Sequence, residues 1–224
     1  PLNALSLFHG VLSAKPHPPD EVTLLEKMRD ALDALVEMFN GLLDVSKLEL
    51  GVTEVSHSNF PVQSVFDRIG REYTSVAESK GVSLRVVPCS LMIRSEPVLL
   101  ERILRNFVAN AITHAQGKRV LLGARRRGHM LRIDVIDTGV GFDPDLTERL
   151  FDELFQIANP ERRRTKGHGL GLAIVKKAAG LLGHSLDVAS VPGRGARFSV
   201  LAPIVGRDDT RKTAGARRAT PVPV

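Results

Sequence analysis

The stretch VLLERILRNFVANAITHA, residues 98–115, decides the fold of this sequence. Its apolar residues recur every three or four positions, which is the pattern of one buried helix face. Pro97 precedes the stretch and suits the first turn of a helix, where no N–H is needed from it. The sequence therefore predicts a helix anchored in a core. The apolar positions are Leu100, Ile103, Leu104, Phe107, Val108, Ala111 and Ala115.

Two asparagines, Asn106 and Asn110, lie one turn apart on the flank of this apolar face. Their carboxamide oxygens are able to hold a hard cation such as Mg²⁺, which takes its other ligands from water and phosphates. Alternatively, they belong with Arg102 and Thr113 to an ordinary solvated polar stripe. The helix alone leaves both interpretations open.

Two later stretches favour a nucleotide site. Residues 131–142, LRIDVIDTGVGF, alternate like a strand and end in Asp137 followed by Gly139 and Gly141. Such a strand end places one carboxylate in a pocket, and glycines let the backbone pass close to a flat ligand. Residues 166–175, KGHGLGLAIV, form a glycine-rich turn that leads into an apolar helix. The N–H groups at a helix start favour phosphate oxygens.

In this order, the three stretches resemble the catalytic and ATP-binding region of sensor histidine kinases. The wider superfamily includes DNA gyrase, the MutL repair proteins and the ninety-kilodalton chaperones. Four family boxes are present: the N box at residues 106–114, the first glycine box at 137–141, the F box at 151–155 and the second glycine box at 167–171. The resemblance extends through the amino-terminal part and covers the chain up to about Pro203.

The resemblance implies a role for each site residue. Asp137 would accept a hydrogen bond from the adenine amino group, Asn110 would hold Mg²⁺ at the phosphates, and Asn106 would support that site. Separately from the resemblance, the position of Lys166 and the arginines at 162–164 just before Gly167 favours a γ-phosphate contact by at least one of them, with Lys166 as the candidate, although a solvated charge run is the commoner fate of such a cluster. The remaining residues of the ATP site would be His114, Gly139, Gly141, Phe155, Gly167, His168, Gly169, Leu170 and Gly171.

The segment between Phe142 and Lys166 has no regular pattern and is interpreted as a lid over the nucleotide. Two positions depart from the family: Thr113 stands where Lys or Arg is common, and Ala196 stands where threonine is usual. Histidines 114, 168 and 184 lack the spacing of a zinc site. We therefore expect no metal bound by histidine.

The first 50 residues predict two amphipathic helices, one at residues 1–14 and one from Asp20 to about Leu48, joined by a proline-rich turn. A lone helical hairpin does not bury both faces, so dimerisation into a four-helix bundle is expected. The pair resembles the dimerisation and phosphoacceptor domain of the family. The phosphorylated histidine would stand five residues before Pro1, outside this sequence, and His9 is interpreted as a surface or interface histidine.

The expected fold class is α+β, with this hairpin followed by a two-layer α/β sandwich whose sheet is mixed, the Bergerat-type ATP-binding fold. The expected domains are residues 1–50, a linker at 51–57, the ATP-binding domain at 58–203 and a basic tail at 204–224. Beyond the helix at 98–115, helices are expected at 62–80 and 170–182. Strands are expected at 58–62, 83–87, 91–94, 119–124, 129–137, 185–190 and 196–201, with the arginines at 125–127 in a hairpin turn.

Composition excludes several other classes. The chain has 224 residues, and its single cysteine, Cys89, allows no disulfide within the chain. No apolar run is long enough to span a bilayer, so we expect a cytoplasmic chain that is part of a cytoplasmic or membrane-anchored protein. The net charge is +6, but no basic patch is interleaved with aromatic residues, so binding to nucleic acid is not expected.

The sequence thus predicts the ATP- and Mg²⁺-dependent core of a protein histidine kinase in a two-component system. It would form a homodimer and pass phosphate to a response-regulator receiver domain, to which the tail is a possible linker. Asn106 stands where hydrolysing superfamily members place a glutamate, and an amide is no general base, so transfer is favoured over hydrolysis. The alternatives are a non-catalytic nucleotide-binding or interaction module and a hydrolysing ATPase clamp.

Overall fold

The computed structural model describes residues 2–49, 55–115, 118–152, 155 and 169–205. The linker at 50–54 and the tail from 206 lie outside the described residues. The chain divides into two compact units, one of residues 1–53 with 150–174 and the other of residues 54–149 with 175–224.

The first unit contains the expected helical hairpin, formed by α1 (Leu2–Ser13) and α2 (Pro19–Glu49). His9 donates from Nε2 to the carbonyl oxygen of Leu25 at 2.7 Å, which ties the two helices together. His17 closes the turn, because its two ring nitrogens lie 2.8 Å from the Leu12 carbonyl and 2.8 Å from the Glu21 carboxylate. The hairpin leaves many large apolar side chains exposed: Leu5, Leu7, Phe8, Val11, Leu12, Val22, Leu24, Met28, Leu35 and Phe39.

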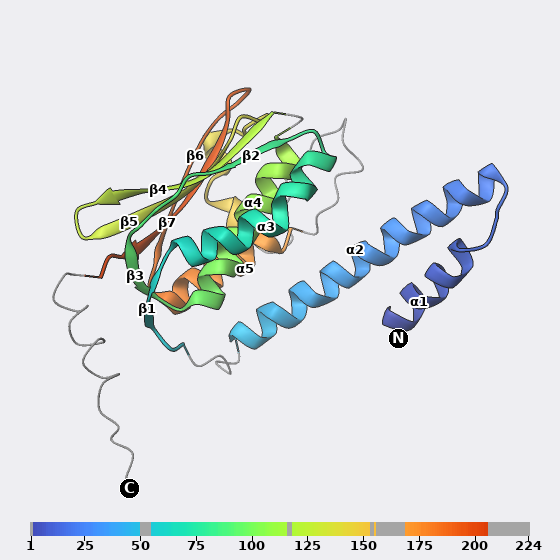
Figure 1. Cartoon of the computed structure of the whole chain (residues 1–224), viewed down its shortest axis with the longest axis horizontal. Helices are drawn as coiled ribbons and strands as arrows, with labels where there is room; N and C mark the ends of the chain where they lie inside the picture. Colours follow the sequence, from blue (N-terminus) through green and yellow to red (C-terminus); the bar gives the residue numbers. More distant parts are fainter. Residues whose placement is uncertain (1, 50–54, 116–117, 153–154, 156–168, 206–224) are drawn as a thin grey trace, which may run out of the picture. The chain divides into compact units, whose positions relative to one another are not determined.

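The second unit is built on a five-stranded sheet in the order β2-β4-β5-β7-β6 (Figure 1). The strands are β2 (Ser83–Val86), β4 (Arg119–Arg127), β5 (Met130–Asp137), β6 (Ser185–Val191) and β7 (Gly195–Pro203). β2 runs parallel to β4 and the other neighbours are antiparallel, so the sheet is mixed, as the sequence predicts. A separate antiparallel pair joins β1 (Ser58–Pro61) to β3 (Met92–Ser95).

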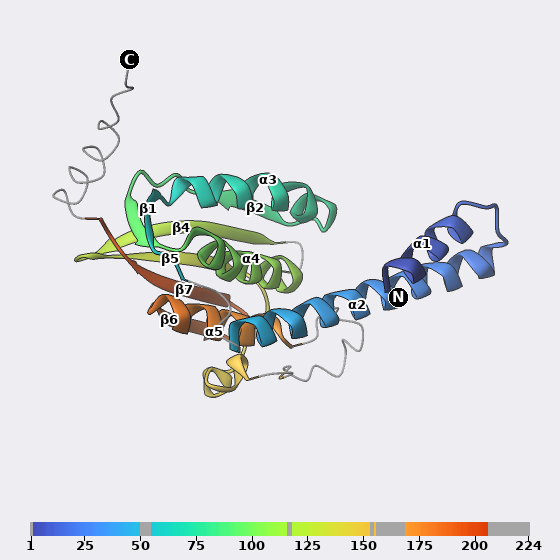
Figure 2. The same cartoon turned by 90° about the horizontal axis from the view of Figure 1, so that it is seen from below.

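Helices cover one face of this sheet. Figures 1 and 2 show α3 (Gln63–Ser79), α4 (Pro97–His114) and residues 175–182 of α5 (Gly171–Leu182) on the same side. Arg68 of α3 and Glu101 of α4 form an ion pair that links two of these helices. The unit is therefore the expected two-layer α/β sandwich. None of the helices within the described part of the chain has both the length and the apolar character that a membrane-spanning segment requires.

Helix α4 begins at Pro97, one residue before the predicted stretch, because a proline in the first turn and a side-chain cap both favour a helix start there. Pro97 occupies the first turn, and the Glu96 side chain accepts hydrogen bonds from the backbone N–H groups of Val98 and Leu99. The apolar face is buried as the three-and-four spacing predicts. Its buried residues are Leu99, Leu100, Ile103, Leu104, Phe107, Val108, Ala111 and Ile112.

Strand β5 lies in the middle of the sheet, between β4 and β7. Alternate residues of a strand share one face, and Leu131, Ile133 and Val135 are all buried. Asp137 continues this row at the strand's last position. The strand therefore delivers a carboxylate onto the face of the sheet that the helices cover.

One expectation for the sheet was wrong. The arginines at 125–127 do not form a turn; they pair within β4 with Arg132, Leu131 and Met130 of β5. The turn contains only Gly128 and His129, and Gly128 adopts a positive φ of 61°. Charged residues are tolerated in this strand because their side chains are exposed to water.

Candidate functional site

The carboxylate of Asp137 is the most deeply buried acidic group at the predicted site, with 5% of the residue exposed. Its Oδ1 accepts a hydrogen bond from the backbone N–H of Gly139 at 2.8 Å, and the backbone N–H of Ala196 also donates to it. Burial raises the pKa of this carboxyl above its usual value, whereas the two N–H groups and nearby His114 lower it in part. A further donor from a ligand would stabilise the charged form.

Helix α4 carries Asn106, Asn110 and His114 at successive turns. Asn106 donates from Nδ2 to the backbone oxygen of Arg102 at 2.9 Å, so one side of its amide is held by the helix itself. Asn110 is half-buried, and its side chain makes no hydrogen bond to the described residues. His114 is exposed and interacts electrostatically with Asp137. This polar row therefore ends beside the buried carboxylate.

Gly139 lies where the end of α4 and the loop after β5 approach most closely. A Cβ atom at this position would lie 2.2 Å from the carbonyl oxygen of His114 and 2.8 Å from Oδ1 of Asp137. No side chain fits in that space. The first glycine of the DTGVG stretch therefore allows the helix that bears Asn110 to meet the strand that bears Asp137.

The β6–β7 hairpin holds the other side of the same loop. A Cβ atom on Gly195 would lie 2.0 Å from the Asp137 carbonyl oxygen, and Gly195 has a φ of 94°. The backbone N–H of Gly193 donates to the carbonyl of Val140 at 2.6 Å. Gly141 is similarly enclosed, since its Cβ would lie 2.2 Å from the Val191 carbonyl oxygen. The loop at 137–141 is thus clamped between α4 and the hairpin.

Aromatic rings support this loop from the core. The Phe198 ring of β7 lies 5.4 Å from the Phe107 ring of α4 and 6.1 Å from the Phe142 ring that follows the loop, measured between centroids. The backbone N–H of Phe142 also donates to Oγ of Ser190 at 2.8 Å. Sequence reasoning did not include Ser190, Gly195 or Phe198 in the site. The GRG sequence in the turn at 193–195 was the available signal for the close approach.

The second glycine box is described only in part. Gly169 has a φ of 68°, Leu170 is buried, and Gly171 begins α5. The Leu170 carbonyl accepts the N–H of Ile174 at 3.0 Å, which starts the helical hydrogen-bond pattern. Phe155 is half-buried, and its N–H donates to the Asp152 carbonyl at 3.3 Å. Lys166, Gly167, His168 and the arginines at 162–164 lie outside the described residues.

The side chains at the predicted site suit a metal ion that arrives with a nucleotide better than a metal ion bound by the protein alone. The described residues contain no group of three or more His, Cys, Asp or Glu side chains that could hold an ion. Asn110 offers a single neutral oxygen on a half-buried helix position. Mg²⁺ commonly has few protein ligands when it is bound through waters and substrate phosphates. The residues present therefore fit Mg²⁺ that arrives with a nucleotide.

Comparison with known proteins identifies the family. Residues 95–205 match the family described as histidine kinase-, DNA gyrase B-, and HSP90-like ATPases. Residues 95–205 form a domain of this ATPase family. The matched segment of the ATPase begins at Ser95, just before α4, and ends after β7, so it includes Asn106, Asn110 and Asp137.

Relatives of this chain are named sensor histidine kinase or sensor-like histidine kinase. RcsC of Escherichia coli strain K12 is 30% identical over 207 residues, which are 90% of this chain and 22% of that protein. SenX3 of Mycobacterium tuberculosis strain H37Rv is 30% identical over 206 residues, which are 91% of this chain and 50% of that protein. The chain thus spans about a fifth of the length of RcsC and about half of the length of SenX3.

Solved structures agree with the ATPase fold. Full-length ShkA, solved in complex with AMPPNP, matches with a TM-score of 0.73 and 27% identity over 92% of this chain and 43% of that chain. The histidine kinase AdeS of Acinetobacter baumannii has a TM-score of 0.65 at 15% identity over 92% of this chain and 94% of that chain, a likeness of fold alone.

Proposed function

We propose that this chain is the ATP-binding and phosphoryl-transfer core of a sensor histidine kinase. The observation that carries the proposal is the buried carboxylate of Asp137, held at the end of β5 beside the Asn110 helix inside the segment that matches the ATPase family. The relatives' names favour a kinase over a non-catalytic module with the same fold.

Asp137 would recognise the adenine. A carboxylate that accepts two backbone N–H groups still has acceptor capacity, because its two oxygens carry about four lone-pair positions in all. An adenine amino group would donate one hydrogen bond to it. The lack of a side chain at Gly139 and Gly141 keeps the surrounding backbone within reach of a flat ring. Binding would therefore depend on the negative charge of Asp137.

The phosphate end would be held by the N box and the second glycine box. Asn110 would supply one oxygen ligand to Mg²⁺, which neutralises charge on the phosphates when it is bound. Asn106 and His114 would support this edge of α4. Lys166 would contact the γ-phosphate, and backbone N–H groups of residues 167–171 would bind phosphate oxygens, with His168 and Leu170 lining that turn. Phe155 would close over the nucleotide as part of the lid.

Transfer of the γ-phosphoryl group requires little acid or base chemistry from this chain. The bond from the γ-phosphorus to the bridging oxygen breaks, a bond to a histidine nitrogen forms, and ADP leaves with the bond electrons. A neutral imidazole is already a nucleophile near pH 7. Asn106 is a neutral amide whose Nδ2 is bonded to the Arg102 carbonyl, so it does not activate water. This supports transfer to histidine over hydrolysis.

The first unit would supply dimerisation. The apolar side chains of α1 and α2, among them Phe8, Val11, Leu24 and Phe39, are exposed in a single chain. Burial of one such side chain contributes about 1.5–3 kcal/mol. A second copy of the hairpin would cover them in a four-helix bundle, and a receiver domain would then take the phosphate from the bundle's histidine.

The test uses a longer protein that begins upstream of Pro1 and includes the histidine expected there. It is incubated with Mg²⁺ and ATP labelled at the γ-phosphate, and the expected product is a label that is stable to alkali and labile to acid. Asp137→Asn and Asn110→Ala should each abolish it, whereas Asp67→Asn, the same change at an exposed position of α3, should not. A folded protein that binds ATP without gaining this label would contradict the proposed transfer.

A further inference from the structure

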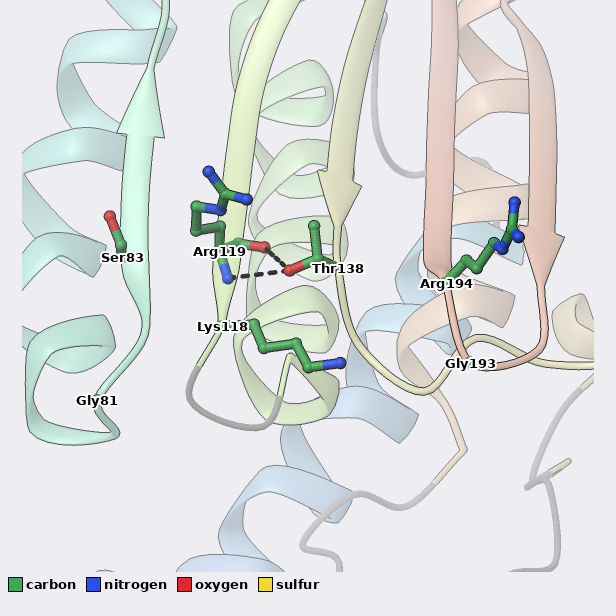
Figure 3. Close-up of a pocket in the computed structure, with 7 residues that line it drawn as sticks. All are labelled: Gly81, Ser83, Lys118, Arg119, Thr138, Gly193 and Arg194. Atoms are coloured by element: carbon green, nitrogen blue, oxygen red, sulfur yellow. Dashed lines mark hydrogen bonds between the residues drawn. The ribbon is translucent and has the colours of Figure 1, made fainter.

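An open pocket of about 630 Å³ lies where several strands of the five-stranded sheet begin or end (Figure 3). Ser83 is the first residue of β2, Arg119 the first of β4, Thr138 follows β5, and Arg194 lies in the β6–β7 turn. Lys118, just before β4, completes the charged lining. Within the part of the chain that the structure describes, none of the residues proposed to bind ATP lines this pocket. Figure 3 shows Arg119 and Thr138 in front of the sheet, with the helices behind it.

The lining is strongly cationic. Lys118 and Arg119 are consecutive residues, and Arg194 comes from the β6–β7 turn. All three are exposed, and none of the described residues that line the pocket is acidic. The ion pairs seen within the described part of the chain involve none of these three side chains. Asp137, next to Thr138 in sequence, faces the opposite side of the sheet and is bonded to Gly139. The three cationic side chains therefore line one pocket without an acidic partner among the described residues.

The backbone that carries these cations is held in place. The N–H of Arg119 donates to Oγ1 of Thr138 at 3.2 Å, and the N–H of Thr138 donates to the Arg119 carbonyl at 3.1 Å. Arg194 lies between Gly193, bonded to Val140 at 2.6 Å, and Gly195, packed against the Asp137 carbonyl. The pocket is consequently formed before any ligand arrives, and only the side-chain ends need to adjust.

We propose that this pocket binds an oxyanion that carries two or more negative charges, at a site separate from the ATP site. Guanidinium groups match the planar geometry of carboxylate and the oxygens of phosphate, and Lys118 adds a mobile point charge. The Ser83 hydroxyl offers a further donor. One exposed charge pair strengthens binding only a few-fold, so a ligand needs several charges that meet several cations at once. Phosphate and carboxylate ligands share this chemistry.

The test is an NMR titration of the whole chain at low ionic strength with pyrophosphate and, separately, citrate. Saturable shifts are expected at the backbone amides of Ser83, Arg119, Thr138 and Arg194. The double variant Arg119→Gln/Arg194→Gln should bind at least about tenfold more weakly, because two charge-assisted contacts are lost. Arg125→Gln removes the same charge from the same strand about 20 Å away and should leave binding unchanged.

The outcomes separate this proposal from the proposed kinase function. Asp137→Asn should retain anion binding even where it loses ATP, because Asp137 does not line the pocket. Preference for pyrophosphate or for citrate would assign the natural ligand to phosphates or to polycarboxylates. Equal affinity in the double variant and the parent chain, shifts confined to residues 137–141, or no binding of either probe would overturn the proposal and leave an ordinary solvated basic surface.

Discussion

Replacing Gly139 with alanine should damage the candidate site by a steric route alone. Gly139 is not one of the glycines with a positive φ, so the backbone φ at this position is compatible with alanine. The new Cβ would, however, lie 2.2 Å from the His114 carbonyl oxygen, where real contacts are no shorter than 3.0 Å. The end of α4 and the loop after β5 must separate by roughly 0.8 Å to accept it.

The expected loss of stability has two sources, the overpacked contact and a stretched hydrogen bond. Overpacking of a tight contact costs about 1–3 kcal/mol. The same shift stretches the 2.8 Å hydrogen bond from the Gly139 N–H to Asp137, and a bond to a charged group contributes about 1.5 kcal/mol or more. We expect the free energy of unfolding to fall by about 2–4 kcal/mol, which leaves most single domains folded. Binding of ATP should weaken at least about tenfold, since the Asp137 carboxylate moves.

The assay compares urea unfolding and ATP binding for Gly139→Ala and Gly180→Ala. Gly180 lies near the end of α5 with open space around its Cβ position, so alanine there should stabilise the chain by up to about 1 kcal/mol through helix propensity. If Gly139→Ala retained both the stability and the ATP affinity of the parent, the close approach of α4 to the loop would not be a feature of the folded protein, and the steric reasoning would fail.

Three further predictions concern charge. Burial lowers the pKa of His184, which forms a 2.8 Å hydrogen bond with Ser95, from 6.5 to about 4. The free energy of unfolding should therefore fall by up to about 3 kcal/mol as the pH drops from 6.5 to 4. Unfolding titrations should show a smaller fall in His184→Gln and an unchanged fall in His129→Gln. Burial raises the pKa of Asp137, so its contribution to stability is present at low pH and declines as pH rises through the raised value; a pH series should lack this decline in Asp137→Asn. Burial raises the pKa of the Glu101 carboxyl, but hydrogen bonds from Arg68 and Arg105 outweigh this effect and hold the pKa below its usual value. Chemical denaturation at pH 7 should therefore show that Glu101→Gln lowers the free energy of unfolding by about 1 kcal/mol, whereas the exposed control Glu78→Gln should leave it almost unchanged.

Local signals were sufficient for the elements that carry the site. The apolar spacing and Pro97 located α4 within one residue at each end, and the alternation before Asp137 located the end of β5. The arginines of β4 were assigned to a turn because three charges in a row are typical of loops. Cross-strand pairing with β5 decides that segment instead, and pairing is not visible in a single stretch of sequence.

Contacts between distant segments were beyond sequence reasoning. The space that excludes a side chain at Gly195 depends on how the β6–β7 hairpin packs against the end of β5. Likewise, His184 attracted attention only as a possible metal ligand, whereas it is buried against Ser95 with 8% of the residue exposed. Burial of a histidine depends on elements remote in sequence, so its spacing from other histidines does not reveal it.

The most direct test of the central claim is a calorimetric titration of ATP with Mg²⁺ into the chain, its Asp137→Asn variant and the exposed control Asp67→Asn. We predict binding between the micromolar and millimolar ranges for the parent and the control. Asp137→Asn should bind about 10- to 100-fold more weakly, which corresponds to one lost hydrogen bond to a charged acceptor. Equal binding by parent and Asp137→Asn, or no binding by a folded parent, would contradict the assignment of the nucleotide site to the end of β5.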